Sequence, residues 1–132
     1  MKRKISPRSY EKLCFASYLS LFAIVVTGGL VRLTGSGLGC SDWPQCNSEK
    51  FVDVSSMHGA IEQINRLFTG FVAAIVIAAV LGSLFLAERK RSLTRLSLGL
   101  VVGVLAQVVL GGIVVLTGLN PFANMGHFLL SM

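Results

Sequence analysis

Charged side chains are missing from three long stretches of this 132-residue chain: residues 13–31, 67–87 and 96–132. Charged residues make up 14% of the sequence, against 53% hydrophobic residues. This composition excludes soluble enzyme folds, disordered tails and disulfide-stapled secreted domains. Each stretch is long enough to cross a hydrocarbon core as a helix, which takes roughly 20 residues. We therefore expect an all-α membrane protein of one domain.

Tryptophan, histidine and cysteine are also scarce, with one, two and three residues. Neither histidine has a cluster of carboxylates or thiols beside it in the sequence, so a tetrahedral zinc site is disfavoured. The basic residues could suggest a nucleic-acid-binding arm, but each basic block adjoins an apolar stretch. We expect membrane lipid as a partner, and no nucleic acid.

The basic residues gather on one side of the predicted spans. Nine of the twelve lysines and arginines lie in residues 2–12 and 89–95. With Glu11 and Glu88, that side of the membrane carries a net charge of +7, and the opposite side carries −1. The positive-inside rule then makes residues 1–12 a cytoplasmic N-terminus of a multi-pass protein of the cell membrane.

The apolar stretches predict helical spans that make up one unit, residues 13–132. Ser55 or Ser56 could cap the second span, and Asn120 with Pro121 should end the third. The predicted spans are about 13–31, 55–86 and 96–119, with a truncated fourth from 127. Six residues of helix rise only about 9 Å, so the fourth run cannot cross a bilayer. The sequence looks cut short, or a partner polypeptide completes the fourth span.

An internal repeat relates the first and third spans. Residues 25–35 align with residues 108–118, and eight of the eleven positions are identical. Both copies end an outward-going span, and a helix with a histidine follows each of them. Repeats of the same orientation predict half of a four-helix-bundle architecture, in which the second and fourth helices face each other.

His58 and His127 lie on those two helices, and the repeat predicts a similar depth for both near the outer surface. Two facing imidazoles suit a haem iron between bundle helices. The alternative is that each histidine sits at the interface, hydrogen-bonded to water or to a lipid headgroup.

Other polar residues accompany these histidines. Glu62 and Asn65 share a helical stripe with His58, and Glu62 could accept a proton beside a bound substrate. Arg66 and Arg32 could hold propionates or other carboxylates. The alternatives are a helix-surface ion pair between Glu62 and Arg66, and arginines that reach for lipid phosphates.

The three cysteines fall into two groups. Cys40 and Cys46 lie in an external loop, where an oxidising compartment favours a disulfide that is either structural or redox-active. Cys14 is expected to be a small buried residue of the first span. Gln107, in the third span, is expected to link helices by a hydrogen bond.

The motif of residues 28–40, followed by Asp42-Trp43-Pro44 and Cys46, resembles the signature that ends the first helix of haem A synthases. The resemblance covers about residues 20–132. It implies the N-terminal half of a protein with eight helices in two similar four-helix halves. Such enzymes oxidise a methyl group of haem O to a formyl group to give haem A for terminal oxidases. The resemblance implies haem O as substrate in this half, and haem b in the missing C-terminal half.

The same resemblance assigns roles to individual residues. His127 matches a haem ligand on the fourth helix, and Glu62 matches an acidic residue needed for activity. Cys40 and Cys46 match an external cysteine pair. Asn65 stands where many members carry a histidine ligand. One branch of the family has Asn at this point and a histidine that matches His58.

The sequence therefore predicts a haem A synthase-like oxidoreductase fragment that is inactive alone. Its completion would come from a C-terminal half or from homo-oligomerisation, and its electron acceptor is unknown. A non-catalytic haem-binding or assembly subunit is one alternative. A quinone-linked membrane thiol oxidase that uses Cys40 and Cys46 is another.

Overall fold

The structure, a computed structural model, describes residues 4–88 and 90–132. These residues form four α-helices and no β-strand, which confirms the all-α class. The helices are α1 (Pro7–Leu33), α2 (Met57–Leu84), α3 (Arg91–Leu116) and α4 (Pro121–Ser131). Lys2, Arg3 and Arg89 of the two basic blocks lie outside the described residues.

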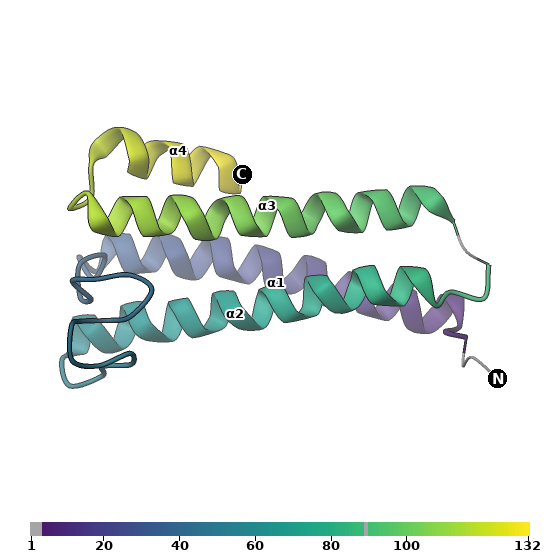
Figure 1. The fold of residues 1–132 in the computed structure, drawn as a ribbon, viewed down its shortest axis with the longest axis horizontal. Helices are drawn as coiled ribbons and strands as arrows, with labels where there is room; N and C mark the ends of the chain where they lie inside the picture. The colour runs from purple at the N-terminus through teal and green to yellow at the C-terminus, as the bar shows by residue number, and fades with distance from the viewer. Residues whose placement is uncertain (1–3, 89) are drawn as a thin grey trace.

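The three long helices lie side by side, and each packs on the next along the chain (Figure 1). The short helix α4 runs back along α3 and ends part of the way down it (Figure 1). The long loop between α1 and α2 covers one end of the bundle, which we call the loop end. At the other end, the backbone of Ile5 bonds to Phe85 and Ala87, so the N-terminal segment is tied to the α2–α3 turn.

Helices α1, α2 and α3 have 27, 28 and 26 residues and are apolar enough to cross a membrane. Large hydrophobic side chains such as Phe15, Phe22 and Val102 are exposed. Small polar residues face inward instead, and Tyr10 bonds Ser97 between α1 and α3 at 3.1 Å. Apolar surfaces that face outward suit a lipid environment, with small polar groups between the helices. The chain is thus a multi-pass membrane protein.

Two expectations about the helices are wrong. The fourth helix begins at Pro121 and not at His127, because the Asn120 side chain accepts from the amides of Phe122 and Ala123. Proline at the first helical position favours this start, so Asn120 and Pro121 begin a helix as well as ending one.

Cys14 is exposed on α1 and not buried. For α2, Ser56 is the cap, with its hydroxyl 3.0 Å from the amide of Gly59.

The two copies of the repeat end their helices in the same way. Gly35 and Gly118 both have positive φ, at 68° and 63°. The amide that follows each glycine bonds back over the last turn, from Ser36 to Val31 at 2.9 Å and from Leu119 to Val114 at 2.8 Å. A glycine in the left-handed conformation with this bond is a common helix end. The repeated sequence therefore folds into a repeated helix end.

We predict that Gly35→Ala and Gly118→Ala each lower the free energy of unfolding by about 1 kcal/mol, because a Cβ is disfavoured at positive φ. Denaturation of the purified protein in detergent micelles measures this loss. Gly103→Ala is the matched control, since Gly103 lies inside α3 with open space where a Cβ would be. An equal loss in the control would refute the explanation.

Candidate functional site

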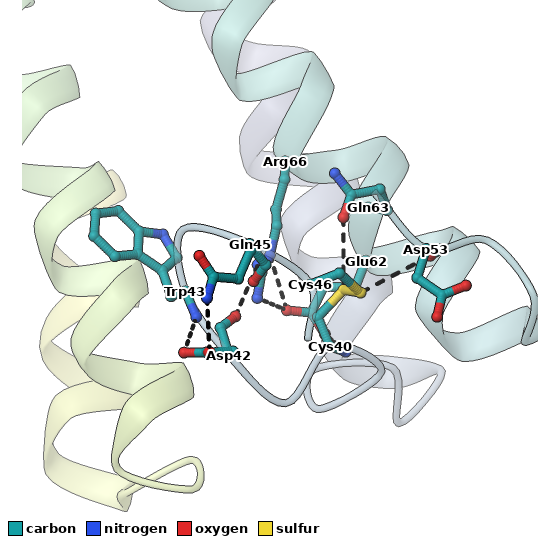
Figure 2. A network of polar contacts seen from close by, with 9 residues as sticks. All are labelled: Cys40, Asp42, Trp43, Gln45, Cys46, Asp53, Glu62, Gln63 and Arg66. Carbon is teal, nitrogen blue, oxygen red and sulfur yellow. Dashed lines mark hydrogen bonds and ion pairs between the residues drawn. A yellow bond between two sulfur atoms is a disulfide. The ribbon is translucent and has the colours of Figure 1, made fainter. Parts of the chain in front are cut away.

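The disulfide loop, residues 34–56, joins α1 to α2 at the loop end (Figure 1). Cys40 and Cys46 form the predicted disulfide within it, and both residues are buried. Figure 2 shows this bond at the centre of a polar network that reaches from α2 into the loop. The disulfide is therefore a packed part of the molecule.

Glu62 anchors the loop to α2. The residue is buried, with 5% of its surface exposed, so its charge needs partners. Its Oε2 accepts from the backbone amide of Cys40 at 2.9 Å, and its Oε1 accepts from Nε of Arg66 at 3.1 Å. Both carboxylate oxygens are thus engaged (Figure 2).

Arg66 continues the same network on the other side of the carboxylate. One of its terminal nitrogens donates to the carbonyls of Asp42 at 3.0 Å and Gln45 at 3.1 Å. The expected ion pair with Glu62 is present, but it is mostly buried and it holds the loop. For Arg66 to bind a carboxylate of a ligand, it would have to give up some of these bonds.

The first part of the loop packs directly on the beginning of α2. A Cβ on Gly39 would lie 2.3 Å from the carbonyl carbon of His58, so only glycine permits this approach. Oε1 of Gln63 lies 3.6 Å from the sulfur of Cys40. Since a disulfide sulfur has no proton to donate, this is a packing contact. The loop and the first turns of α2 form one unit.

Trp43 links the other side of the loop to α3. A Cβ on Gly112 would lie 2.8 Å from Cδ2 of the indole, so the ring rests on the backbone of α3. Figure 2 shows the indole directed at that helix, away from the disulfide. The adjacent Asp42 accepts from the amide of Trp43 at 2.8 Å. The disulfide loop therefore bridges α2 and α3.

His127 lies on α4 and packs on the glycine next to that contact. Its Cε1 would be 3.5 Å from a Cβ on Gly111. Its Nδ1 is buried and has no hydrogen-bond partner among the described residues. The exposed Arg32 lies at the end of α1. Its guanidinium carbon is 6.0 Å from the ring centre of Phe128, which lies on α4 like His127. No hydrogen bond to either nitrogen of the imidazole is found among the described residues, and the buried one is Nδ1.

His58 occupies a different environment. It is exposed, and its Nδ1 is 2.9 Å from Oγ of the buried Ser36, in the disulfide loop. Asn65, two turns further along α2, accepts from Oγ1 of Thr27 on α1 at 2.9 Å. The expected hydrogen bond of Gln107 is not found, since its buried Nε2 has no partner among the described residues.

The repeat allows these depths to be compared. Thr27 adjoins Gly28, which aligns with Gly111, where His127 packs. The residue of α2 at the depth of His127 is therefore Asn65, and His58 lies roughly 10 Å closer to the loop end. These contacts therefore do not support the similar depth expected for the two histidines.

The structure thus gathers part of the predicted set of site residues and separates the rest. Glu62 and Arg66 meet the disulfide in one network. His127 lies on α4 and Arg32 lies beside that helix, whereas His58 and Asn65 each form a hydrogen bond elsewhere. The contact between Trp43 and Gly112 was not predicted from the sequence. The glycine pair of the repeat was the available signal, since glycine on a helix often marks a close approach.

We predict that Glu62→Gln lowers the free energy of unfolding by about 3 kcal/mol, because it leaves the Arg66 charge uncompensated in a mostly buried site. Denaturation in detergent measures the stability. Lys50→Ala is the control, because Lys50 is exposed and its ion pair with Asp53 is long, at 3.9 Å. The control should lose less than about 1 kcal/mol. Equal losses would show that the Glu62 pair does not anchor the loop.

A pH effect is expected from Asp53 in the disulfide loop. Hydrogen bonds from the hydroxyl and the amide of Ser55 lower the pKa of Asp53. Because the pKa of Asp53 is lower in the folded protein, the ionised carboxylate stabilises the loop at pH values above the ordinary pKa of Asp. This stability is lost as the pH falls through the pKa of Asp53 in the folded protein. Ser55→Ala should raise the pKa towards the ordinary value of Asp, as measured by carboxyl NMR titration. An unchanged pKa would contradict this assignment.

Comparison with known proteins shows what the chain is similar to. Residues 11–60 match the sequence model of a family described as cytochrome oxidase assembly protein. The chain is 30% identical over 134 residues to a heme A synthase of Geobacillus thermodenitrificans, which covers 95% of this chain and 41% of that protein. It is 31% identical over 126 residues to the heme A synthases of Bacillus mycoides (strain KBAB4) and Bacillus cereus (strain AH187), again over 95% of this chain and 40% of theirs.

The chain thus spans about two fifths of the length of these relatives. The resemblance noted in the sequence motifs is confirmed by these alignments, which are with proteins named heme A synthases.

Proposed function

We propose that the chain binds haem O within its helical bundle and acts as part of a haem A synthase, which oxidises a ring methyl group to a formyl group. The tetrapyrrole is the substrate, and His127 is the residue that would hold its iron. The support is the likeness to heme A synthases along nearly the whole chain, together with the geometry around His127.

The observation that carries this proposal is the orphaned ring nitrogen of His127. A buried polar atom without a hydrogen-bond partner is unfavourable, so a ligand or a water molecule that binds the imidazole would stabilise it. The imidazole is a common axial ligand of haem iron. The iron would anchor the bound tetrapyrrole, and the electrons that the methyl group loses would pass to the haem b that the resemblance implies for the C-terminal half and then to an external acceptor.

Arg32 is the proposed partner for a propionate. It is exposed at the last turn of α1, beside Phe128, so its charge is close to α4 and open to a ligand. Guanidinium groups bind carboxylates strongly by paired hydrogen bonds. Arg66 is the weaker choice, because the carbonyls of the loop already occupy one of its nitrogens.

The proposed orientation places the disulfide loop outside and the N-terminus in the cytoplasm. The basic blocks support this direction through the positive-inside rule. The disulfide supports it as well, because such bonds persist on the oxidising side of a membrane.

A second candidate function is a haem-binding or assembly subunit that performs no oxidation. The engagement of Glu62 favours it, since its carboxylate charge is paired with Arg66 and holds the loop, and taking a proton would weaken these bonds. Both candidates require the same haem site. They differ in whether added haem O gains a formyl group, which mass spectrometry of the extracted tetrapyrrole would detect.

The test is a reduced-minus-oxidised haem spectrum of the full chain in detergent. We predict that His127→Ala abolishes the haem signal, because it removes the axial ligand, and that His58→Ala leaves it intact. Asn65→His should convert the signal to that of a low-spin iron with two histidines, because it places an imidazole at the depth of His127. Survival of the wild-type spectrum in His127→Ala would sink the proposal. Loss in His58→Ala alone would favour His58 as the ligand.

A further inference from the structure

Two aromatic rings rest on neighbouring glycines of α3. A Cβ on Gly112 would lie 2.8 Å from the indole of Trp43, which is too close, and a Cβ on Gly111 would lie 3.5 Å from the imidazole of His127, which is an ordinary contact distance. The equivalent glycines of the first repeat, Gly28 and Gly29, have no atom within 4 Å of a Cβ position. The pair on α3 is therefore used for contacts that its copy does not make.

The indole comes from a loop that is fixed at its other side. Arg66 holds the carbonyl of Asp42, the residue next to Trp43, and Glu62 holds the amide of Cys40. Both anchors belong to α2. A continuous set of contacts thus runs from α2 through the disulfide loop to the glycine pair, and from that pair to His127.

Helix α4 has little else to hold it. It has 11 residues and packs against α3, with Arg32 beside Phe128 as a further contact. Each of its residues keeps part of its surface exposed, although the Nδ1 atom of His127 is buried. The position of His127 therefore depends on how the glycine pair of α3 is packed, and Trp43 packs on that pair from the loop side.

We propose that Trp43 is a positioning residue for His127: it braces the Gly111-Gly112 segment of α3 and so sets where the imidazole stands. This inference rests on the proposed function where it concerns haem. Its structural part concerns only this chain. A large aromatic ring on a glycine pair is suited to the role, because it covers a wide apolar area with few rotatable bonds.

The first experiment uses the fluorescence of Trp43, which is the only tryptophan in the chain. Gly112→Ala puts a methyl carbon 2.8 Å from Cδ2 of the indole, which is too close, so the ring must shift. We expect a red-shifted emission and easier quenching by acrylamide. Gly103→Ala is the control on the same helix, because it has open space and should leave the emission unchanged. Unchanged emission in Gly112→Ala would overturn the proposal.

The second experiment follows position 127 without haem. In a Cys14→Ser background, which removes the exposed free thiol, His127→Cys is labelled with a maleimide. We expect faster labelling when Trp43→Ala or Gly112→Ala is added, and no change with Gly103→Ala. Trp43→Phe should restore most of the slow rate, since it keeps an aromatic ring on the glycine. Equal rates in all variants would overturn the proposal.

The third experiment uses the haem-loaded protein. Trp43→Ala should weaken haem binding by about tenfold and shift the EPR signature of the iron, as loss of a group that orients a metal ligand does. Adding Gly112→Ala to Trp43→Ala should change little more, because both remove the same contact. A residue that merely stabilises the fold would leave the EPR signature of the folded fraction unchanged, and that result would overturn the proposal.

The failures can be told apart. If the wild-type chain binds no haem, the proposed function fails, and the labelling rates at position 127 still decide whether Trp43 positions this site. If haem binds through His127 and the Trp43 variants alter neither the labelling rate nor the spectrum, only the positioning role fails.

Discussion

The buried pair of Glu62 and Arg66 is the interaction on which the loop end depends. Neither charge could remain in this setting alone, and each uses its spare hydrogen-bonding capacity on the disulfide loop. A loop of 23 residues loses much conformational entropy when it is ordered, and the pair and the disulfide together offset this cost. Through the loop, α2 gains a connection to α3 at the loop end in addition to the direct packing of the two helices.

Much of the fold could be predicted from the sequence. The spans followed from the length of the charge-free stretches, and the repeat predicted two matching helix ends, which Gly35 and Gly118 form. The disulfide was expected from two cysteines in one loop. The start of α4 was missed because Asn120 and Pro121 both end one helix and begin another. Cys14 was misplaced because in a membrane the exposed face of a helix is apolar, so an apolar residue does not indicate burial.

The candidate site was less predictable, because its contacts depend on the depth of each helix. Helical spacing correctly placed Glu62 one turn from Arg66, yet spacing alone does not show that the loop returns to bond both residues. The depth of His58 could not be read from the repeat, since the two connecting loops differ in length. The buried Nδ1 of His127, which lacks a partner among the described residues, could not be predicted from any sequence pattern.

The matching helix ends have a consequence for how the two copies have diverged. Over the eleven aligned positions, the chemistry differs at two only: Thr27 replaces Leu110, and Arg32 replaces Val115. Those two side chains of the first copy reach other helices, at Asn65 on α2 and at Phe128 on α4. The identical residues thus form the same helix end in both copies. The two differing residues, Thr27 and Arg32, connect the first copy to other helices.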